Sequence, residues 1–496
     1  MGIMSFLLPA DLPPETVREL ERACILGGPD SMPWPSQVKV EPGLLTVRRG
    51  VEESGSLVVP WTIDGAGHLL SATATLIERE QPYQFLVELA RGKVHQLRTQ
   101  SAEWQAGGLQ MPPDLTQKIR DASVGFSRAV TTPPSEDAGK EAQGVLTQGY
   151  QAAEQLVREY IEQMFQARHL RQPRLDTTQG CFLGPGDLSS QHKDVLLQTC
   201  NNVCLDLSWK AVETTEANYR WEAYDAILDW AVEQGLSVSA GPLIDFSTSH
   251  LPEWLWLWER DLASIATFMA DYVQTAVKRY QGRIRSWQLT GASNCATLLG
   301  LGEDELLWLT VRMAEAARQI DPKIEMIVGI AQPWGEYMAA QDRTHSPFIF
   351  ADTLLRSGLN LAGLDLELMM GLEPRGSYCR DLISVSRMID LYTILGVPLR
   401  VTMGYPSAAG SDAKAHADMK VSAGSWRRGF SPEAQAEWAA DFVALALCKP
   451  SVRAIQWVHL SDAHPHLFPQ CGLFDGSDQP KPVVQSLRDL RERHLR

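Results

Sequence analysis

Cysteine is scarce in this sequence and widely scattered. The 496 residues include eight cysteines, and only Cys200 and Cys204 lie close together. A structural zinc site would need a second such pair, which the sequence lacks. We therefore expect reduced cysteines in the core of a cytoplasmic protein, with no metal and no other cofactor.

Long apolar runs and excess positive charge are also missing. No uninterrupted apolar stretch approaches the roughly 20 residues of a membrane helix. The short apolar run at 6–10 follows no basic segment of the kind that begins a signal peptide. The 45 lysines and arginines are outnumbered by 60 acidic residues, which gives a net charge of −15. An acidic protein repels phosphates and anionic lipids, so neither nucleic acid nor a membrane is expected as a partner.

The composition that remains is that of a globular protein with more than one domain. Hydrophobic residues make up 44% and charged residues 21% of the chain. In the segment 1–35, a helix is predicted at 14–24, followed by a loop rich in glycine and proline. Between 36 and 112, five short runs resemble strands, at 38–40, 44–48, 55–60, 72–77 and 85–89. They predict an antiparallel β-sandwich, either a carbohydrate-binding module or a plain structural domain.

Residues 113–175 are predicted to connect this sandwich to the rest of the chain. The stretch 113–140 is polar, and adjacent prolines stand at 112–113 and at 133–134. Both features favour a linker. Over 141–168, apolar residues recur at helical spacing and predict one long helix.

From residue 176 onward, predicted strands and helices alternate. The strands are placed near 177–183, 202–209, 236–246, 284–292, 324–332, 362–370, 398–405 and 453–461. The helices are placed near 190–200, 221–235, 259–280, 303–320, 349–358, 380–396, 431–448 and 481–494. Eight such pairs predict a (β/α)8 TIM barrel over 176–496, so the fold class is α/β with an N-terminal β-sandwich. The active site of such a barrel lies at the carboxyl ends of its strands.

Several short motifs of the barrel half follow one another in a fixed order. They read LSWKAVE at 207–213, YDAILDWAVEQG at 224–235, LPEW at 251–254, AEAARQIDP at 314–322, WVHLSD at 457–462, LFD at 473–475 and KP at 481–482. In this order they resemble glycoside hydrolase family ten, the xylanase-type enzymes. The resemblance covers about 200–490 and implies a TIM barrel, hydrolysis of O-glycosyl bonds and a carbohydrate ligand.

The resemblance also locates the positions that carry this family's chemistry. Retaining glycosidases use two carboxyl groups about 5–5.5 Å apart, one as acid/base and one as nucleophile. The family's acid/base glutamate ends a strand-four motif that reads WQLTGA at 287–292 here, so Ala292 stands in its place. Its strand-seven nucleophile aligns with Met403. Neither side chain can donate a proton or form a glycosyl ester, so double-displacement hydrolysis is predicted to be lost.

Other polar groups at the predicted strand ends are candidates for a rebuilt site. The candidate catalytic carboxylates are Glu367, Glu336 and Asp245. The candidate substrate-binding residues are Trp209, Trp334, Arg400, Trp457, Asp462 and His464. Each has an alternative: the tryptophans could belong to the core, and Asp365 with Glu367 could form a buried pair satisfied by Arg400 or Arg375. The grouping of Asp462, His464 and His466 matches no standard metal-site spacing, so no metal is predicted.

Two hypotheses for the function follow. In the first, a diverged glycosidase has rebuilt its carboxylate pair, for example from Glu367 with Glu336 or Asp245, and one member has a raised pKa while the other has a lowered one. In the second, the barrel is a non-catalytic carbohydrate-binding or scaffold pseudoenzyme, with an open cleft or a closed mouth. The first hypothesis fails if every carboxylate pair lies more than about 10 Å apart.

Overall fold

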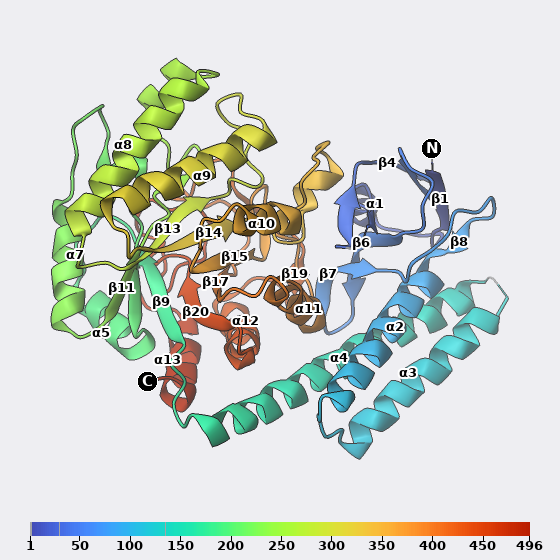
Figure 1. Cartoon of the computed structure of the whole chain (residues 1–496). Helices are drawn as coiled ribbons and strands as arrows, with labels where there is room; N and C mark the ends of the chain where they lie inside the picture. Colours follow the sequence, from blue (N-terminus) through green and yellow to red (C-terminus); the bar gives the residue numbers. More distant parts are fainter. Residues whose placement is uncertain (1, 29, 134) are drawn as a thin grey trace.

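The C-terminal part of the chain forms a closed barrel of eight parallel strands (Figure 1). The computed structural model describes residues 2–28, 30–133 and 135–496. The barrel strands are β9 (Thr178–Leu183), β10 (Asn202–Leu205), β11 (Ser237–Ala240) with its continuation β12 (Ile244–Asp245), β13 (Ser286–Gly291), β14 (Glu325–Ile330), β15 (Gly363–Met369), β17 (Leu399–Gly404) and β20 (Val452–Trp457). Neighbours in the chain pair with each other, and β20 pairs with β9, which closes the ring. The predicted TIM barrel is therefore confirmed.

Helices follow the strands and cover the outside of the barrel. The long ones are α5 (Ser190–Thr199), α7 (Glu222–Glu233), α8 (Leu262–Tyr280), α9 (Glu303–Ile320), α10 (Pro347–Arg356), α11 (Leu382–Thr393), α12 (Pro432–Cys448) and α13 (Val483–His494). Short turns of helix are α6 (Trp209–Val212), η1 (Glu253–Trp258) and η2 (Glu336–Ala339). Local signals set their starts: the Ser431 hydroxyl accepts a hydrogen bond from the Ala434 N–H, and Pro432 begins α12.

The N-terminal part contains two small sheets beside the barrel (Figure 1). The first has the order β4 (Ser36–Glu41), β5 (Leu44–Arg49), β1 (Gly2–Leu7), β8 (Tyr83–Gln84). The second has the order β19 (Ser425–Trp426), β7 (Gly67–Ala72), β6 (Ser56–Ile63), β2 (Cys24–Gly27), β3 (Met32–Trp34). All of these pairings are antiparallel except that of β1 with β8. Antiparallel sheets near the N-terminus were predicted, whereas β1, β2 and β3 add strands around α1 (Pro14–Leu20), where only a helix and a loop were expected.

Three long helices form a bundle where the sequence predicted a fifth strand and a linker (Figure 1). They are α2 (Phe85–Ala106), α3 (Pro113–Thr131) and α4 (Glu136–Arg171). The strand prediction at 85–89 is wrong because the buried apolar positions continue at helical spacing to Val94 and Leu97, beyond the five residues considered. The linker prediction over 113–131 is also wrong. In α3, Leu115, Ile119, Ala122, Phe126 and Ala129 form an apolar stripe among polar residues. The long helix predicted at 141–168 is present as part of α4.

Contacts with the N-terminal sheets and bundle fix the loops at the barrel mouth. The loop after β17 contributes β19, which pairs with β7 at the edge of the second sheet. The same loop contributes β18 (Lys420–Ala423), which pairs with β16 (Gly371–Glu373) from the loop after β15. The buried Lys93 of α2 forms an ion pair with Asp381, the N-cap of α11. Loops that follow two neighbouring barrel strands are thus tied to one another and to the N-terminal part.

Two expectations from composition can be compared with this structure. All eight cysteines are unpaired and seven are buried, as predicted for reduced core residues. Across the described residues, no helix combines the length and apolar character that crossing a membrane requires.

Candidate active site

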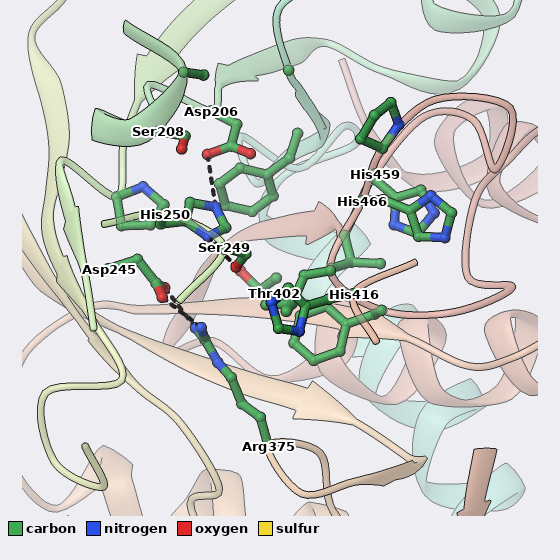
Figure 2. Close-up of a pocket in the computed structure, with 18 of the residues that line it drawn as sticks. Asp206, Ser208, Asp245, Ser249, His250, Arg375, Thr402, His416, His459 and His466 are labelled. Carbon is green, nitrogen blue, oxygen red and sulfur yellow. Dashed lines mark hydrogen bonds and ion pairs between the residues drawn. The ribbon is translucent and has the colours of Figure 1, made fainter. Parts of the chain in front are cut away.

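A cavity of about 410 Å³ lies at the carboxyl ends of the barrel strands (Figure 2). Strand residues that line it include Gln288 of β13, Asp365 and Glu367 of β15, and Thr402 of β17. The segments after the strands add Asp206, Ser208, Lys210, Ser249, His250, Arg375, Lys414, His416 and His466. Phe182 of β9 and Phe468 of a loop provide aromatic surface. Positively charged, negatively charged and hydrogen-bonding groups therefore face one cavity, at the end of the barrel where a barrel enzyme carries its active site.

Arg375 lines this cavity and binds two carboxylates at once. Its Nη1 and Nη2 donate to Asp245 Oδ1 and Oδ2 at 2.6 and 2.7 Å. Nη2 also donates to Glu367 Oε1 at 2.9 Å. Gly291 makes room for this arrangement, since a Cβ atom there would overlap Asp245 Oδ2. Two of the predicted catalytic carboxylates, Asp245 and Glu367, thus share one guanidinium.

The shared arginine gives the two carboxyl groups different protonation behaviour. Burial alone would raise the pKa of Asp245, but the charges of Arg375 and then His250 outweigh burial and hold this pKa at about 2. Burial raises the pKa of Glu367, and Arg375 opposes that shift without cancelling it. The nearby charge of Asp245 adds to the rise. A low pKa on one carboxyl and a raised pKa on its neighbour is the pattern expected of an acid/base pair.

A second buried ion pair supports the cavity floor. Arg400 Nη2 donates to Asp365 Oδ2 at 2.9 Å and also contacts Gln288 Oε1. The Thr402 hydroxyl donates to Asp365 at 2.8–2.9 Å. Arg400, predicted to bind substrate, is 3% exposed and lies below the cavity lining. The alternative given above therefore holds for both acidic residues: Asp365 is satisfied by Arg400, and Glu367 by Arg375.

The positions aligned with the family's glutamates lie outside the cavity lining. Ala292 follows β13 with φ 56° and is 3% exposed. Met403 is fully buried in the main hydrophobic core. Because strand residues alternate between faces, and Thr402 faces the cavity, Met403 faces the opposite side, toward the helices. Position 403 is therefore a packing position in this fold.

Glu336 and Trp334 lie at another place in the molecule. Arg380 Nη2 lies 3.0 Å from Glu336 Oε1, and its guanidinium stacks over the Trp334 ring at 4.5 Å. Neighbouring Tyr337 and Met338 pack against Met32 of the N-terminal part. Neither Glu336 nor Trp334 lines the cavity. The predicted pairing of Glu367 with Glu336 is not formed, because Glu336 lies outside the cavity and pairs with Arg380.

The other predicted tryptophans are core residues. The Trp209 indole N–H donates to Glu213 at 2.6 Å, and its ring stacks on Tyr272. The Trp457 indole N–H donates to the Cys471 carbonyl at 2.7 Å. Both are at most 2% exposed and neither lines the cavity. Their polar atoms are satisfied inside the protein, so stacking on a sugar ring would require them to leave the core.

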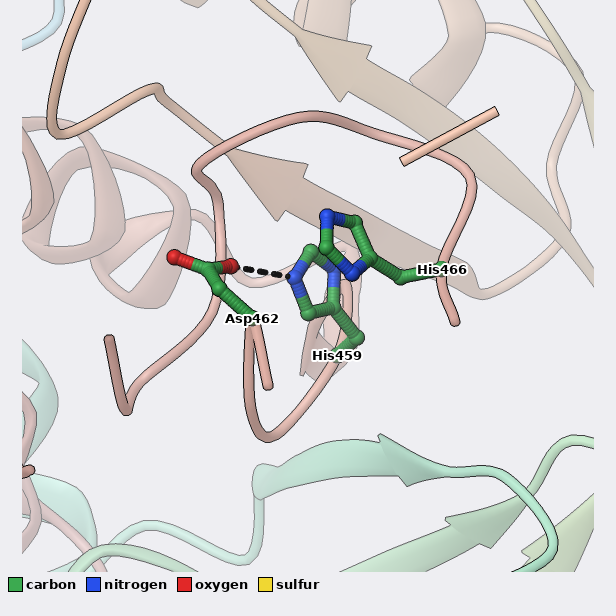
Figure 3. A group of neighbouring side chains, drawn as sticks. All are labelled: His459, Asp462 and His466. Carbon is green, nitrogen blue, oxygen red and sulfur yellow. Dashed lines mark hydrogen bonds and ion pairs between the residues drawn. The ribbon is translucent and has the colours of Figure 1, made fainter. Parts of the chain in front are cut away.

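Asp462 holds together the loop after strand eight (Figure 3). Its carboxylate accepts from His459 Nε2 at 2.8 Å, from the Gly472 N–H at 2.7 Å and from Lys481 Nζ. His466 stacks on the His459 ring at 4.4 Å, whereas His464 is exposed and its carbonyl accepts from His466 Nδ1. Ligand atoms of His459, Asp462 and His466 lie within 4.8 Å of one another, as a metal site requires. The ammonium group of Lys481 already takes the place of a cation beside Asp462, and both ring nitrogens of His466 have other partners, the His464 carbonyl and Asp412. This arrangement therefore does not favour a metal.

The titration of His459 offers a test of this loop. Burial lowers the pKa of His459 to about 4, although Asp462 opposes the shift. Since the unfolded chain binds a proton near pH 6.5, this histidine should reduce the free energy of unfolding as pH falls from about 6.5 to about 4. We expect its ring resonance to titrate near 4 by NMR. The unfolding free energy of His459→Gln, which keeps a donor to Asp462, should depend less on pH in this window. A midpoint above 6 would contradict this.

The sequence did not single out three residues that complete the site. Arg375 was considered only as one of two partners for the acidic pair, and neither His250 nor His416 was among the candidate site residues. His250 lies two residues before Pro252 of the LPEW motif, a signal that could have found it. His416 Nε2 lies 3.0 Å from the Thr248 hydroxyl, which joins the loop after β17 to the loop after strand three across the cavity mouth.

The chain resembles glycosyl hydrolases of family 10, as the motifs predicted. The Glycosyl hydrolase family 10 profile matches residues 174–290. Endo-1,4-beta-xylanase B of Thermotoga neapolitana is 20% identical over 307 residues, which cover 58% of this chain and 80% of the xylanase. Native xylanase 10B of Thermotoga maritima is 16% identical with a TM-score of 0.48, over 64% of this chain and 95% of its own. Xylanase 10B of Thermotoga petrophila, solved with xylobiose, is 17% identical with the same TM-score, over 68% and 97%.

Proposed function

We propose that this protein binds a β-linked oligosaccharide or polysaccharide in the cavity at the barrel mouth and does not hydrolyse it by double displacement. One observation carries most of the proposal: Asp245 and Glu367 both bind Arg375. A carboxylate held by arginine is a weak nucleophile, and arginine releases no proton to a leaving group. Strands four and seven line the cavity with Gln288 and Thr402, which can bind hydroxyl groups but cannot replace the two glutamates.

The cavity suits a ligand with many hydroxyl groups. Its volume of about 410 Å³ falls within the range of small-ligand sites, about 300–1,000 Å³. Carboxylate, hydroxyl, amide and ammonium groups line it, and Phe182 and Phe468 provide apolar surface. The existence of this cavity argues against a closed barrel mouth. One relative is an endo-1,4-beta-xylanase, so β-1,4-linked xylo-oligosaccharides are the first ligands to test.

Isothermal titration calorimetry and a reducing-end assay together test this proposal. We expect xylo-oligosaccharides of two to six units to bind while no reducing ends are released. Lack of binding by a panel of β-linked oligosaccharides would contradict the proposal.

A second candidate function is processing of the bound saccharide by the Asp245–Glu367 pair. It is favoured by the opposite pKa shifts of these carboxyl groups. Reducing ends that appear with the wild-type protein and vanish in Glu367→Gln would support it. The same result would exclude the purely binding role.

Substitution of Lys414 is expected to weaken saccharide binding. This exposed lysine lines the cavity, so its ammonium group can donate to ligand hydroxyls. Loss of one charged donor costs about 1.5 kcal/mol, so we expect the Kd of Lys414→Met to rise about tenfold. Lys420 on β18 is the matched control, an exposed lysine of the same loop that does not line the cavity. Equal effects of the two substitutions would place the ligand elsewhere.

A further inference from the structure

A serine, a histidine and an aspartate form a connected series along one wall of the cavity (Figure 2). Ser249 Oγ lies 2.8 Å from His250 Nδ1. On the other side of the ring, His250 Nε2 lies 3.5 Å from Asp206 Oδ1. All three residues line the cavity and are partly exposed. The saccharide-binding role proposed above makes no use of this series.

The neighbours of His250 indicate which of its nitrogens would accept a proton. Asp206 can only accept, so a proton on Nε2 would face its carboxylate. Nδ1 then has a free lone pair directed at the Ser249 hydroxyl. A hydroxyl within hydrogen-bond reach of a histidine that is oriented by a third group is the arrangement of an activated nucleophile. The distance to Asp206 is long, as is common before a substrate is bound.

The charge around His250 suits a base that works near neutral pH. Burial would lower the pKa of His250, but the carboxylates of Asp206 and Asp245 outweigh burial and raise it, with Arg375 opposing them. A base is most effective when its pKa is close to the working pH. Ser247 also contacts His250 Nδ1, at 3.1 Å, but it does not line the cavity. Ser249 is therefore the hydroxyl that a ligand can reach.

We propose that Ser249, His250 and Asp206 form a catalytic relay that hydrolyses an ester of a small carboxylic acid bound in the cavity. Ser249 Oγ would attack the carbonyl carbon, and its proton would pass to His250 Nδ1. The bond from the carbonyl carbon to the alcohol oxygen breaks, and His250 protonates the departing alcohol. Water then attacks the acyl carbon and gives a proton to His250. The bond from that carbon to Ser249 Oγ breaks, and His250 returns the proton to Oγ as the carboxylic acid leaves. Lys210 and Lys414 line the same cavity, so negative charge on the carbonyl oxygen would develop among cationic side chains.

A fluorophosphonate probe tests the relay without any saccharide, so its outcome is independent of the binding proposal. We expect the folded wild-type protein to be labelled at Ser249, as located by peptide mass spectrometry, and to hydrolyse p-nitrophenyl acetate. Ser249→Ala should abolish labelling, and His250→Asn should slow it about a hundredfold. Asp206→Asn should also slow labelling. Its saccharide affinity, measured in parallel, distinguishes a positioning role of Asp206 from a general loss of the site.

The matched control is Ser208→Ala, which removes another cavity hydroxyl, one that forms no hydrogen bond with His250. Its labelling should equal that of the wild type. Because both serines line the cavity, the thermal midpoint of each variant should stay within a few degrees of the wild type and show that it is folded. Labelling that persists in folded Ser249→Ala, or that is absent from the wild type, would overturn the proposal.

Discussion

Replacing Arg375 with methionine should lower the free energy of unfolding by about 3–5 kcal/mol at pH 7, because it leaves two buried carboxylates without their cation. Asp245 is 2% and Glu367 is 6% exposed, and Arg375 is the cation that binds both of them. Guanidinium unfolding followed by tryptophan fluorescence would measure the loss.

The pH dependence distinguishes this electrostatic cause from a packing defect. Without Arg375, burial and mutual repulsion should raise the pKa of both carboxyl groups above their unfolded values. Groups of this kind lose stability as pH rises through the folded pKa and recover it on acidification. The deficit of Arg375→Met relative to wild type should therefore shrink between pH 7 and pH 5. A deficit that stays constant with pH would point to packing instead.

A surface ion pair of another arginine gives the scale for this effect. Arg285 binds Glu325 at 2.8 Å, but their side chains are 78% and 42% exposed. Surface pairs of this kind contribute about 0–1 kcal/mol. Arg285→Met should therefore change the unfolding free energy by less than about 1 kcal/mol. If both substitutions cost the same, the buried position of Arg375 would not be the cause.

The barrel was predictable because its signals are local. Each strand is a short apolar run, and each helix has an apolar stripe with recognisable ends, such as Ser431 and Pro432 at the start of α12. The bundle was harder to predict for the same reason. Helix α3 buries only one narrow stripe, from Leu115 to Ala129, and the surrounding polar residues hide it. Its packing partners α2 and α4 lie on either side of it in the chain. The sequence predicted a strand at the start of α2 and a connecting helix within α4, so no bundle was expected.

The site was predicted in part, since strand ends located carboxylates but not their partners. Asp245 was proposed because it ends strand three and Glu367 because it lies on strand six, and both line the cavity. Their neighbour Arg375 lies on a loop, 130 residues from Asp245 in the chain. Such a contact depends on how the loop after β15 folds back over the mouth. The proposal that Glu336 joins them failed for a related reason, since the contact of η2 with Met32 directs it elsewhere.

The alignment of the motifs was least informative where a shift of one residue changes the face of the strand on which a side chain lies. A shift of one position moves a side chain from the inside of a barrel to its outside. Thr402 binds Asp365 inside the barrel, and Met403, the next residue, packs in the core with no exposed surface. The absence of a glutamate at 403 is therefore not what removes a carboxylate from the cavity. What matters is that the inward positions of this strand are Arg400 and Thr402.

This interpretation predicts that Met403→Glu will destabilise the fold strongly and will not create hydrolytic activity. An ionised carboxylate buried without a partner on the helix-facing side should cost more than about 4 kcal/mol at pH 7. Its pKa should be raised, so the deficit should shrink as pH falls toward 5. Met403→Gln, of similar size but without charge, should show a smaller deficit that does not change with pH. Met403→Leu should cost less than about 1.5 kcal/mol, since hydrophobic volume is kept. A stable Met403→Glu protein that releases reducing ends from xylo-oligosaccharides would instead mean that position 403 faces the cavity.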